Sequence, residues 1–340
     1  MSDKLFILNN DTGLMVVDAE SVPWVDVESW WDPYVDTTPF VLWPDLASIT
    51  NPEVVAEEWH CVDSWWATDL ESQRDALLEL QAVMEAAEIA WRESSSRFDS
   101  DPLAADWVSG NTTSGPLRTH QEENWSQWFA HLIRTGPSDF SRTLFGERFD
   151  ARPRSVEREV YLSAHDAPDR YADILVFYDG WGVSVEVKKG DEHYQKTTHT
   201  ASLVESQFRE EWNHVLLLPE KKQAALGQSF PGKLSGADAE LLIVTDQMRD
   251  IEVLYWADVG RAIREVLLSE TNTDPHWEAS AYLFCTLIEQ KLARFIPKPV
   301  IDLIIMSSDV VRTSSSVLIG RQDFDEQITY IRDTTNTIDS

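Results

Sequence analysis

Apolar residues recur along the chain with two different periods, and the changes of period predict the order of helices and strands. Helical spacing runs from Ser64 to about Ser94, and a second helix is expected from about His120 to Arg134. The elements expected after these are strands at 157–163, 171–178 and 181–188, a helix at 197–212, strands at 215–218, 241–244 and 251–255, and helices at 257–268 and 277–295. This order of helix, three strands, helix and strand predicts an α/β core from about residue 118 to 300.

Turn-forming residues suggest where the chain divides. Residues 1–60 read as short β segments and loops, and residues 95–117 are rich in Ser, Gly, Asp and Pro. The apolar run from Ile301 to Met306 has the length of a strand. We therefore expect an N-terminal α+β region (1–110), an α/β domain (111–300), and a C-terminal strand and tail (301–340).

Acidic residues dominate the charge of the chain. Its 340 residues include 59 Asp and Glu against 28 Lys and Arg, which gives a formal net charge of −31. Only nine residues are lysine, and the acidity is spread along the whole length. This composition resembles that of proteins from salt-in halophiles, such as a halophilic archaeon or its viruses and plasmids. An acidic protein of a mesophile and a mimic of nucleic acid are the alternatives.

Other bulk properties indicate a cytoplasmic protein without a membrane partner. No apolar run is long enough to span a bilayer, and the N-terminus lacks the pattern of a signal peptide. The two cysteines, Cys61 and Cys285, lie far apart and form neither a disulfide framework nor a zinc motif. The tryptophan-rich N-terminal region is a candidate surface for a protein partner or a homodimer, with Trp24, Trp30, Trp31 and Trp43.

One carboxylate stands inside an apolar strand. Asp173 lies in the run from Tyr171 to Tyr178, where a charge without a partner costs several kcal/mol if buried. The next strand alternates, so its valines share one face while Glu186 and Lys188 share the other. The short Asp179-Gly180 link predicts a hairpin that brings Asp173 beside Glu186.

Two carboxylates on adjacent strands are typical of a Mg²⁺ or Mn²⁺ site, to which the Val187 carbonyl could add a ligand. A neighbouring lysine can position the attacking water or offset charge on a phosphate. The Glu-x-Lys pattern by itself is weak evidence, since it also occurs at Glu220/Lys222 and Glu289/Lys291. Only Glu186 and Lys188 are predicted on an alternating strand next to a strand with an embedded Asp.

Asp173 followed by Glu186-Val187-Lys188, after a helix and a strand, resembles the PD-(D/E)XK nuclease superfamily over residues 118–220. The resemblance implies a restriction-endonuclease-like core, a mixed sheet flanked by helices, and Mg²⁺-dependent hydrolysis of phosphodiester bonds, with DNA as the substrate. It also implies an acidic residue on the first core helix, for which Glu122 is preferred over Glu123. Ala172 stands where many relatives have Pro. A nuclease-fold binding or regulatory protein without activity is the alternative.

The segment after the Glu186 strand is rich in groups that bind nucleic acid. Lys188, Lys189 and Lys196 are three of the nine lysines. With Tyr194 and Gln195, which are expected to open the next helix, Lys189 and Lys196 are candidate contacts for phosphates. A solvated loop is the alternative.

Overall fold

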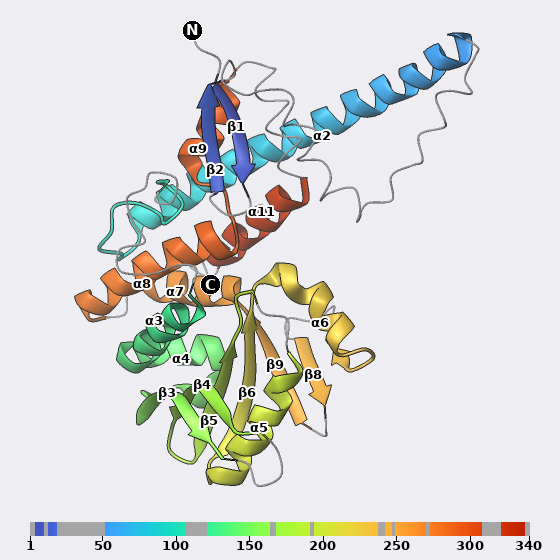
Figure 1. The fold of residues 1–340 in the computed structure, drawn as a ribbon. Helices are drawn as coiled ribbons and strands as arrows, with labels where there is room; N and C mark the ends of the chain where they lie inside the picture. Colours follow the sequence, from blue (N-terminus) through green and yellow to red (C-terminus); the bar gives the residue numbers. More distant parts are fainter. Residues whose placement is uncertain are drawn as a thin grey trace. The chain divides into compact units, whose positions relative to one another are not determined.

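The computed structural model describes residues 4–9, 13–18, 52–106, 121–163, 168–190, 194–236, 242–246, 249–269, 273–307 and 321–336 (Figure 1). The chain forms two compact units, residues 1–82 with 299–328 and residues 83–298 with 329–340. The division expected at residues 110 and 300 stays a prediction. The four tryptophans at positions 24, 30, 31 and 43 lie outside the described residues.

The first unit combines a hairpin with helices. Strand β1 (Lys4–Asn9) pairs antiparallel with β2 (Gly13–Asp18), and helix α2 (Pro52–Glu93) begins in this unit. The expectation of β segments and loops up to residue 60 is therefore wrong for its last part. Pro52 occupies the first helical position, where the missing N–H has no cost.

The strand expected at the C-terminal side is also wrong. Residues 301–306 belong to helix α9 (Lys298–Met306), which buries Val300, Ile301 and Ile304. This spacing suits a helix, and a short apolar run does not distinguish the two by periodicity alone. Residues 321–336 form helix α11 (Arg321–Asn336) within the segment expected as a tail.

The second unit is built on a mixed seven-stranded sheet. Its strands are β3 (Ser155–Leu162), β4 (Arg170–Phe177), β5 (Trp181–Val187), β6 (Glu211–Leu218), β7 (Leu234–Ser235), β8 (Leu242–Asp246) and β9 (Arg249–Tyr255). They are ordered β3-β4-β5-β6-β9-β8-β7. Strand β6 runs parallel to both of its neighbours, and the other pairs are antiparallel.

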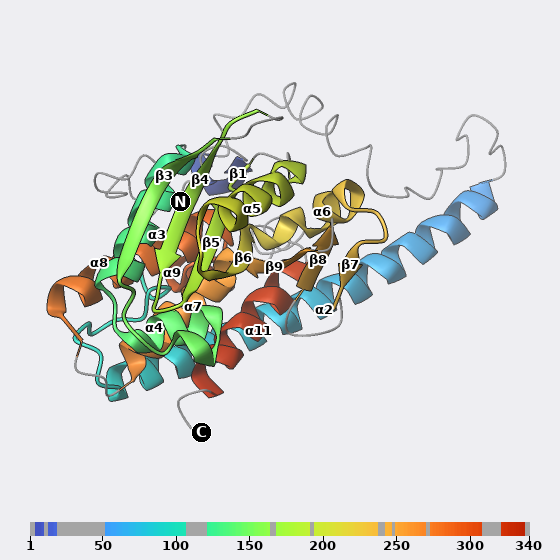
Figure 2. The same cartoon turned by 90° about the horizontal axis from the view of Figure 1, so that it is seen from below.

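Helices cover both faces of this sheet (Figures 1 and 2). The larger core packs one face against α3 (Glu122–Thr135), α4 (Ser138–Phe145), α7 (Trp256–Leu268) and α8 (Pro275–Leu287). On the other face lie α5 (Gln195–Gln207) and α6 (Gln223–Ser229). Short turns complete the unit, namely the 3₁₀ helices η4 (Glu147–Phe149) and η5 (Glu220–Lys222) and the π-helix η6 (Ile288–Leu292). The expected α/β architecture, a mixed sheet flanked by helices, is confirmed.

The predicted order of helix, three strands, helix and strand is confirmed as α3, β3 to β5, α5 and β6, but helix α4 and the 3₁₀ helix η4, which were not predicted, lie between α3 and β3. One boundary is wrong, because α5 ends at Gln207 and Trp212 lies in β6. The Trp212 ring packs on Phe177, with ring centroids 5.3 Å apart. It also covers Gly182, where an added Cβ would stand 2.5 Å from the ring.

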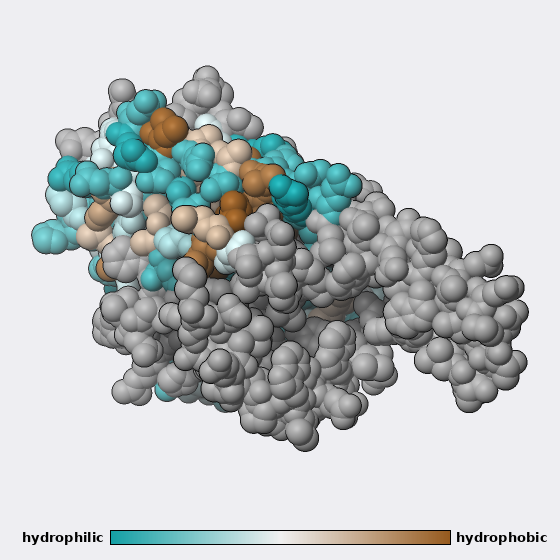
Figure 3. Space-filling model, turned by 90° about the horizontal axis from the view of Figure 1, so that it is seen from above, coloured by the Kyte–Doolittle hydropathy of each residue, from teal (hydrophilic) through white to brown (hydrophobic). Residues whose placement is uncertain are grey.

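Figure 3 shows one face, on which teal hydrophilic side chains surround a few brown hydrophobic patches. None of the described helices combines the length and apolar composition that crossing a membrane requires.

Candidate functional site

The β4–β5 hairpin brings Asp173 and Glu186 together as predicted. Gly180 turns the chain with a positive φ of 82°, and the Tyr178 N–H donates to the Trp181 carbonyl at 2.8 Å. The last paired residues of the two strands are Ile174 and Val185. Asp173 comes directly before Ile174 and Glu186 directly after Val185, so the two carboxylates stand on neighbouring strands where the regular ladder ends.

Asp173 fills the gap that opens beyond this last pair. Its Oδ2 accepts a hydrogen bond from the Val187 N–H at 2.8 Å, in place of a backbone acceptor on β4. The carboxylate is thereby held at the end of β5, largely shielded from solvent. The Asp173 carboxylate, for which the sequence indicated no partner, therefore has a hydrogen-bond donor that fixes its position.

Lys188 places its ammonium group among carboxylates. Its Nζ lies 2.9 Å from Glu186 Oε1 and 3.9 Å from Glu122 Oε1, and only 7% of the residue is exposed. The alternation predicted from the sequence is confirmed, because Val183, Val185 and Val187 all lie in the large core on the opposite face. The backbone of Lys188 is fixed on both sides, since its N–H donates to the Leu217 carbonyl at 2.7 Å and its carbonyl accepts from the indole N–H of Trp256 at 3.1 Å.

Glu122 reaches the site from the first turn of α3. Its Oε2 accepts a hydrogen bond from the backbone N–H of Lys189 at 2.7 Å, while its Oε1 faces Lys188. Glu123, the other candidate on this helix, is exposed. Arg158 on β3 binds the same turn, because its Nη2 donates to the Glu123 carbonyl and to Ser126 Oγ, each at 3.3 Å.

The electrostatics of this cluster favour the uptake of a cation. Burial and the neighbouring Glu186 raise the pKa of Asp173 to about 7, from its ordinary value near 3.8. Burial alone would lower the pKa of Lys188, but the charges of Glu186, Asp173 and Glu122 outweigh it and raise that pKa. Three carboxylates thus share one ammonium group, and their mutual repulsion together with burial bears mainly on Asp173, whose charged form is disfavoured.

The residues expected to contact nucleic acid differ in how far they are buried. Lys189 is half-buried beside Glu122, and burial lowers its pKa. Lys196 is exposed on α5, and Gln195 is the first residue of that helix. Tyr194 is fully buried in a cluster with Leu216 and Leu218. The Tyr194 ring is therefore not available to nucleic acid at this position, because residues of β6, α6 and β9 pack around it.

Two positioning residues had no signal in the sequence. Trp256 and Arg158 lie far from Glu186 along the chain, and each acts through a backbone atom that no motif marks. The other Glu-x-Lys pairs lie where the sequence placed them, with Glu220 and Lys222 in a turn after β6 and Glu289 and Lys291 in a helical segment.

The donor set fits a hard cation with few protein ligands. Within the described part of the chain, no three His, Cys, Asp or Glu side chains form a preformed metal-binding group. Mg²⁺ is ordinarily bound through one or two carboxylates and keeps several waters. Asp173 and Glu186 supply such a pair, and their mutual repulsion is the property that a divalent cation relieves.

Backbone strain lies directly opposite Asp173. Arg158 pairs with Ile174 and Val160 with Ala172, but the intervening Glu159 has a positive φ of 51° and pairs with no residue of β4. Left-handed backbone costs a non-glycine residue about 1 kcal/mol or more. The ladder is therefore interrupted on both sides of Asp173, and backbone strain of this kind clusters at functional sites.

Replacing Glu159 with glycine should raise the free energy of unfolding by up to about 1 kcal/mol, because glycine adopts positive φ without steric cost. Glu157, exposed on the same strand in ordinary β conformation, provides the matched control. There, glycine should lower stability by about 0.5–1 kcal/mol. Urea unfolding of both variants measures the difference, and equal losses would contradict a strained Glu159.

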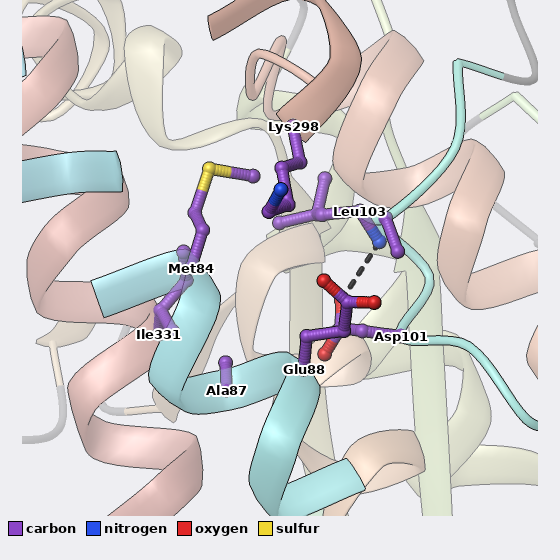
Figure 4. Close-up of a pocket in the computed structure, with 8 residues that line it drawn as sticks. Met84, Ala87, Glu88, Asp101, Leu103, Lys298 and Ile331 are labelled. Atoms are coloured by element: carbon purple, nitrogen blue, oxygen red, sulfur yellow. Dashed lines mark hydrogen bonds between the residues drawn. The ribbon is translucent and has the colours of Figure 1, made fainter. Parts of the chain in front are cut away.

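A separate small pocket in the second unit is unsuited to catalysis (Figure 4). Its lining includes Met84, Leu103, Ile331, Glu88, Asp101 and Lys298. Asp101, which accepts from the Leu103 N–H at 2.8 Å, is already ion-paired with Arg264. Glu88 pairs with Arg92 at 2.8 Å. Both of its carboxylates are therefore already ion-paired with an arginine.

Comparisons with protein-family models, with curated proteins and with solved structures found no match to this chain. The class of the protein therefore rests on its α/β fold and on the Asp173, Glu186, Lys188 and Glu122 cluster.

Proposed function

We propose that this protein is a metal-dependent nuclease of the PD-(D/E)XK class with a restriction-endonuclease-like core, and that it hydrolyses phosphodiester bonds in DNA. The observation that carries the proposal is the position of Lys188, whose ammonium lies 2.9 Å from Glu186 at the point where Asp173 interrupts the β4–β5 ladder. The order of α3, β3 to β5, α5 and β6 supports the same class.

Each group of the cluster has a distinct task in this proposal. Asp173 and Glu186 would hold Mg²⁺ or Mn²⁺, and the Val187 carbonyl would be a further ligand. When bound, the metal supplies charge neutralisation and an activated water. Lys188 donates hydrogen bonds to the attacking water or to a phosphoryl oxygen. Glu122 holds the Lys189 backbone through the 2.7 Å bond and keeps Lys188 oriented.

The acidic chain limits how DNA can be held. A formal charge of −31 repels phosphates, and the usual basic footprint is missing from the composition. Lys189 and Lys196 are the cations next to the cluster along the chain, and bound metal would add positive charge. Molar salt reduces the range of the repulsion to about 3 Å, so activity in concentrated KCl is consistent with the proposal.

Incubation of the wild-type protein with plasmid, single-stranded DNA and RNA in high KCl tests the reaction. Products are expected with Mg²⁺ or Mn²⁺ and none with EDTA. Cleavage of DNA but not RNA would support the proposed substrate. Binding without cleavage of any substrate would favour a silent nuclease-fold binding protein.

A metal-binding titration tests the carboxylates separately. Glu186→Gln should weaken Mn²⁺ binding at least about tenfold, because it removes one of two anionic ligands. Glu220→Gln alters the exposed Glu-x-Lys pair and should leave the Mn²⁺ affinity unchanged. Calorimetry or electron paramagnetic resonance measures both, and equal affinities for Glu186→Gln and wild type would remove Glu186 from the site.

A further inference from the structure

Two tyrosines form an exposed aromatic pair at the end of the β3–β4 ladder. Tyr161 on β3 is 53% exposed and Tyr171 on β4 is 61% exposed. Among the Phe, Trp and Tyr side chains whose burial the structure describes, these are the only two that are exposed. They are paired in register, with ring centroids 5.5 Å apart and planes inclined by 60°. Such a pair exposes apolar ring faces to water, and a planar ligand could stack on them.

The pair is held in place before any ligand arrives. The hydroxyl of Tyr161 donates to Asp169 Oδ2 at 2.5 Å, which fixes the ring of Tyr161. Tyr171 lies against that ring on the neighbouring strand. A surface ordered in this way loses little conformational entropy on binding, so more of the contact energy appears as affinity.

The rings point away from the packed side of the two strands. Val160, Leu162 and Ala172 alternate with them and pack against α5 through Val204. Tyr161 and Tyr171 therefore lie on the opposite side. That side is the one on which Arg158 holds the first turn of α3. This turn carries Glu122, so the tyrosines and Glu122 lie on the same side of the sheet, whereas the side chains of Glu186 and Lys188 point to the α5 side. The pair is therefore a neighbour of the site along β4.

The distance from the pair to the candidate site suits a short stretch of nucleic acid. Tyr171 lies two residues from Asp173 along β4, which is about 6.6 Å of strand. Strand β4 has no partner on β5 before Ile174, so the end that carries the pair extends past β5 (Figure 2). Two stacked nucleotides span a similar length, at about 3.4 Å per step.

We propose that Tyr161 and Tyr171 stack against the unpaired bases of single-stranded nucleic acid next to the candidate cleavage site. This inference rests on the proposed nuclease function, which would supply the nucleic-acid substrate. Stacking acts through the ring faces and requires no positive charge, which suits an acidic chain. Asp169 and Glu159 near the pair repel phosphates, so the bases and not the backbone meet the rings. Duplex DNA conceals its base faces, so the pair selects single strands.

Binding without metal tests this proposal apart from cleavage. Fluorescence anisotropy in EDTA would follow a labelled thymidine oligonucleotide, the same backbone with abasic sites, and a blunt duplex. Tyr171→Ala should weaken binding of the thymidine oligonucleotide roughly 5- to 100-fold, while Tyr171→Phe keeps it within about twofold. The abasic strand and the duplex should bind wild type and Tyr171→Ala equally. Leu283→Ala removes an exposed side chain on α8 and serves as the control.

The outcomes separate the two proposals. Tyrosine-dependent binding of single strands with no cleavage in Mg²⁺ would overturn the nuclease and leave the stacking surface. Cleavage by a wild-type protein whose single-strand affinity does not depend on Tyr171 would overturn the stacking surface alone. No binding of the thymidine oligonucleotide, or equal losses for abasic and thymidine strands, would also overturn it.

Discussion

Replacing Arg264 with leucine is expected to lower the free energy of unfolding by about 3–5 kcal/mol, because it leaves two buried carboxylates without their cation. Arg264 on α7 is 2% exposed and donates to Asp101 at 2.5 and 2.8 Å. It also donates to Glu289 at 2.5 and 3.1 Å. Tyr330 completes the cluster by donating to Glu289 at 2.7 Å. This ion cluster therefore joins the segment after α2, helix α7, the π-helix η6 and α11.

Urea unfolding measures this loss, and two further variants identify its cause. Arg92→Leu removes an exposed pair with Glu88 and should change stability by about 0.5 kcal/mol or less. Adding Asp101→Asn and Glu289→Gln to Arg264→Leu should recover part of the loss, since the uncompensated charges disappear. A loss of less than about 1 kcal/mol for Arg264→Leu would contradict the burial of this cluster.

Asp173→Asn is expected to stabilise the metal-free protein at neutral and alkaline pH. The pKa of Asp173 is raised to about 7 in the folded protein, so ionisation there opposes folding. The folded protein binds this proton more tightly than the unfolded chain does. Stability from the protonated carboxyl is therefore present below about pH 4 and is lost as the pH rises to about 7. Above that, the variant should exceed wild type by up to about 4 kcal/mol.

Urea unfolding in EDTA across this pH range measures the effect. The two proteins should be equally stable near pH 4 and diverge as the pH rises. Added Mn²⁺ should stabilise wild type and have little effect on the variant, because only wild type keeps the full charge that attracts the ion. If the stability of the two proteins changed with pH in parallel, ionisation of Asp173 would not oppose folding and the prediction would be wrong.

The part of the site that could be predicted depends on local patterns. The valines at 183, 185 and 187 fix which face carries Glu186 and Lys188, and the short Asp179-Gly180 link brings Asp173 alongside. These features act over neighbouring residues, so the period of two and the turn chemistry suffice to predict them. The same reasoning predicted six of the seven strands of this sheet, all except the two-residue β7.

The rest depends on contacts between residues far apart in the chain. The Trp256 indole holds the Lys188 carbonyl across 68 positions, and no pattern near either residue indicates it. Tyr194 follows a polar, lysine-rich segment that reads as surface, yet packing under β9 and α6 buries it. Glu159 alternates with its neighbours like any strand residue, and its positive φ arises from the irregular ladder around Asp173.

The rate of Mg²⁺-dependent DNA cleavage by Lys188→Ala, relative to Lys222→Ala, tests the central claim most directly. Both variants remove the lysine of a Glu-x-Lys pair, but only Lys188 lies among Glu186, Asp173 and Glu122. Loss of its stabilising hydrogen bond should slow cleavage by about 10²-fold or more, while Lys222→Ala keeps the wild-type rate. Thermal unfolding of Lys188→Ala would verify that it is folded. Equal cleavage rates for the two folded variants would contradict a catalytic site at Lys188.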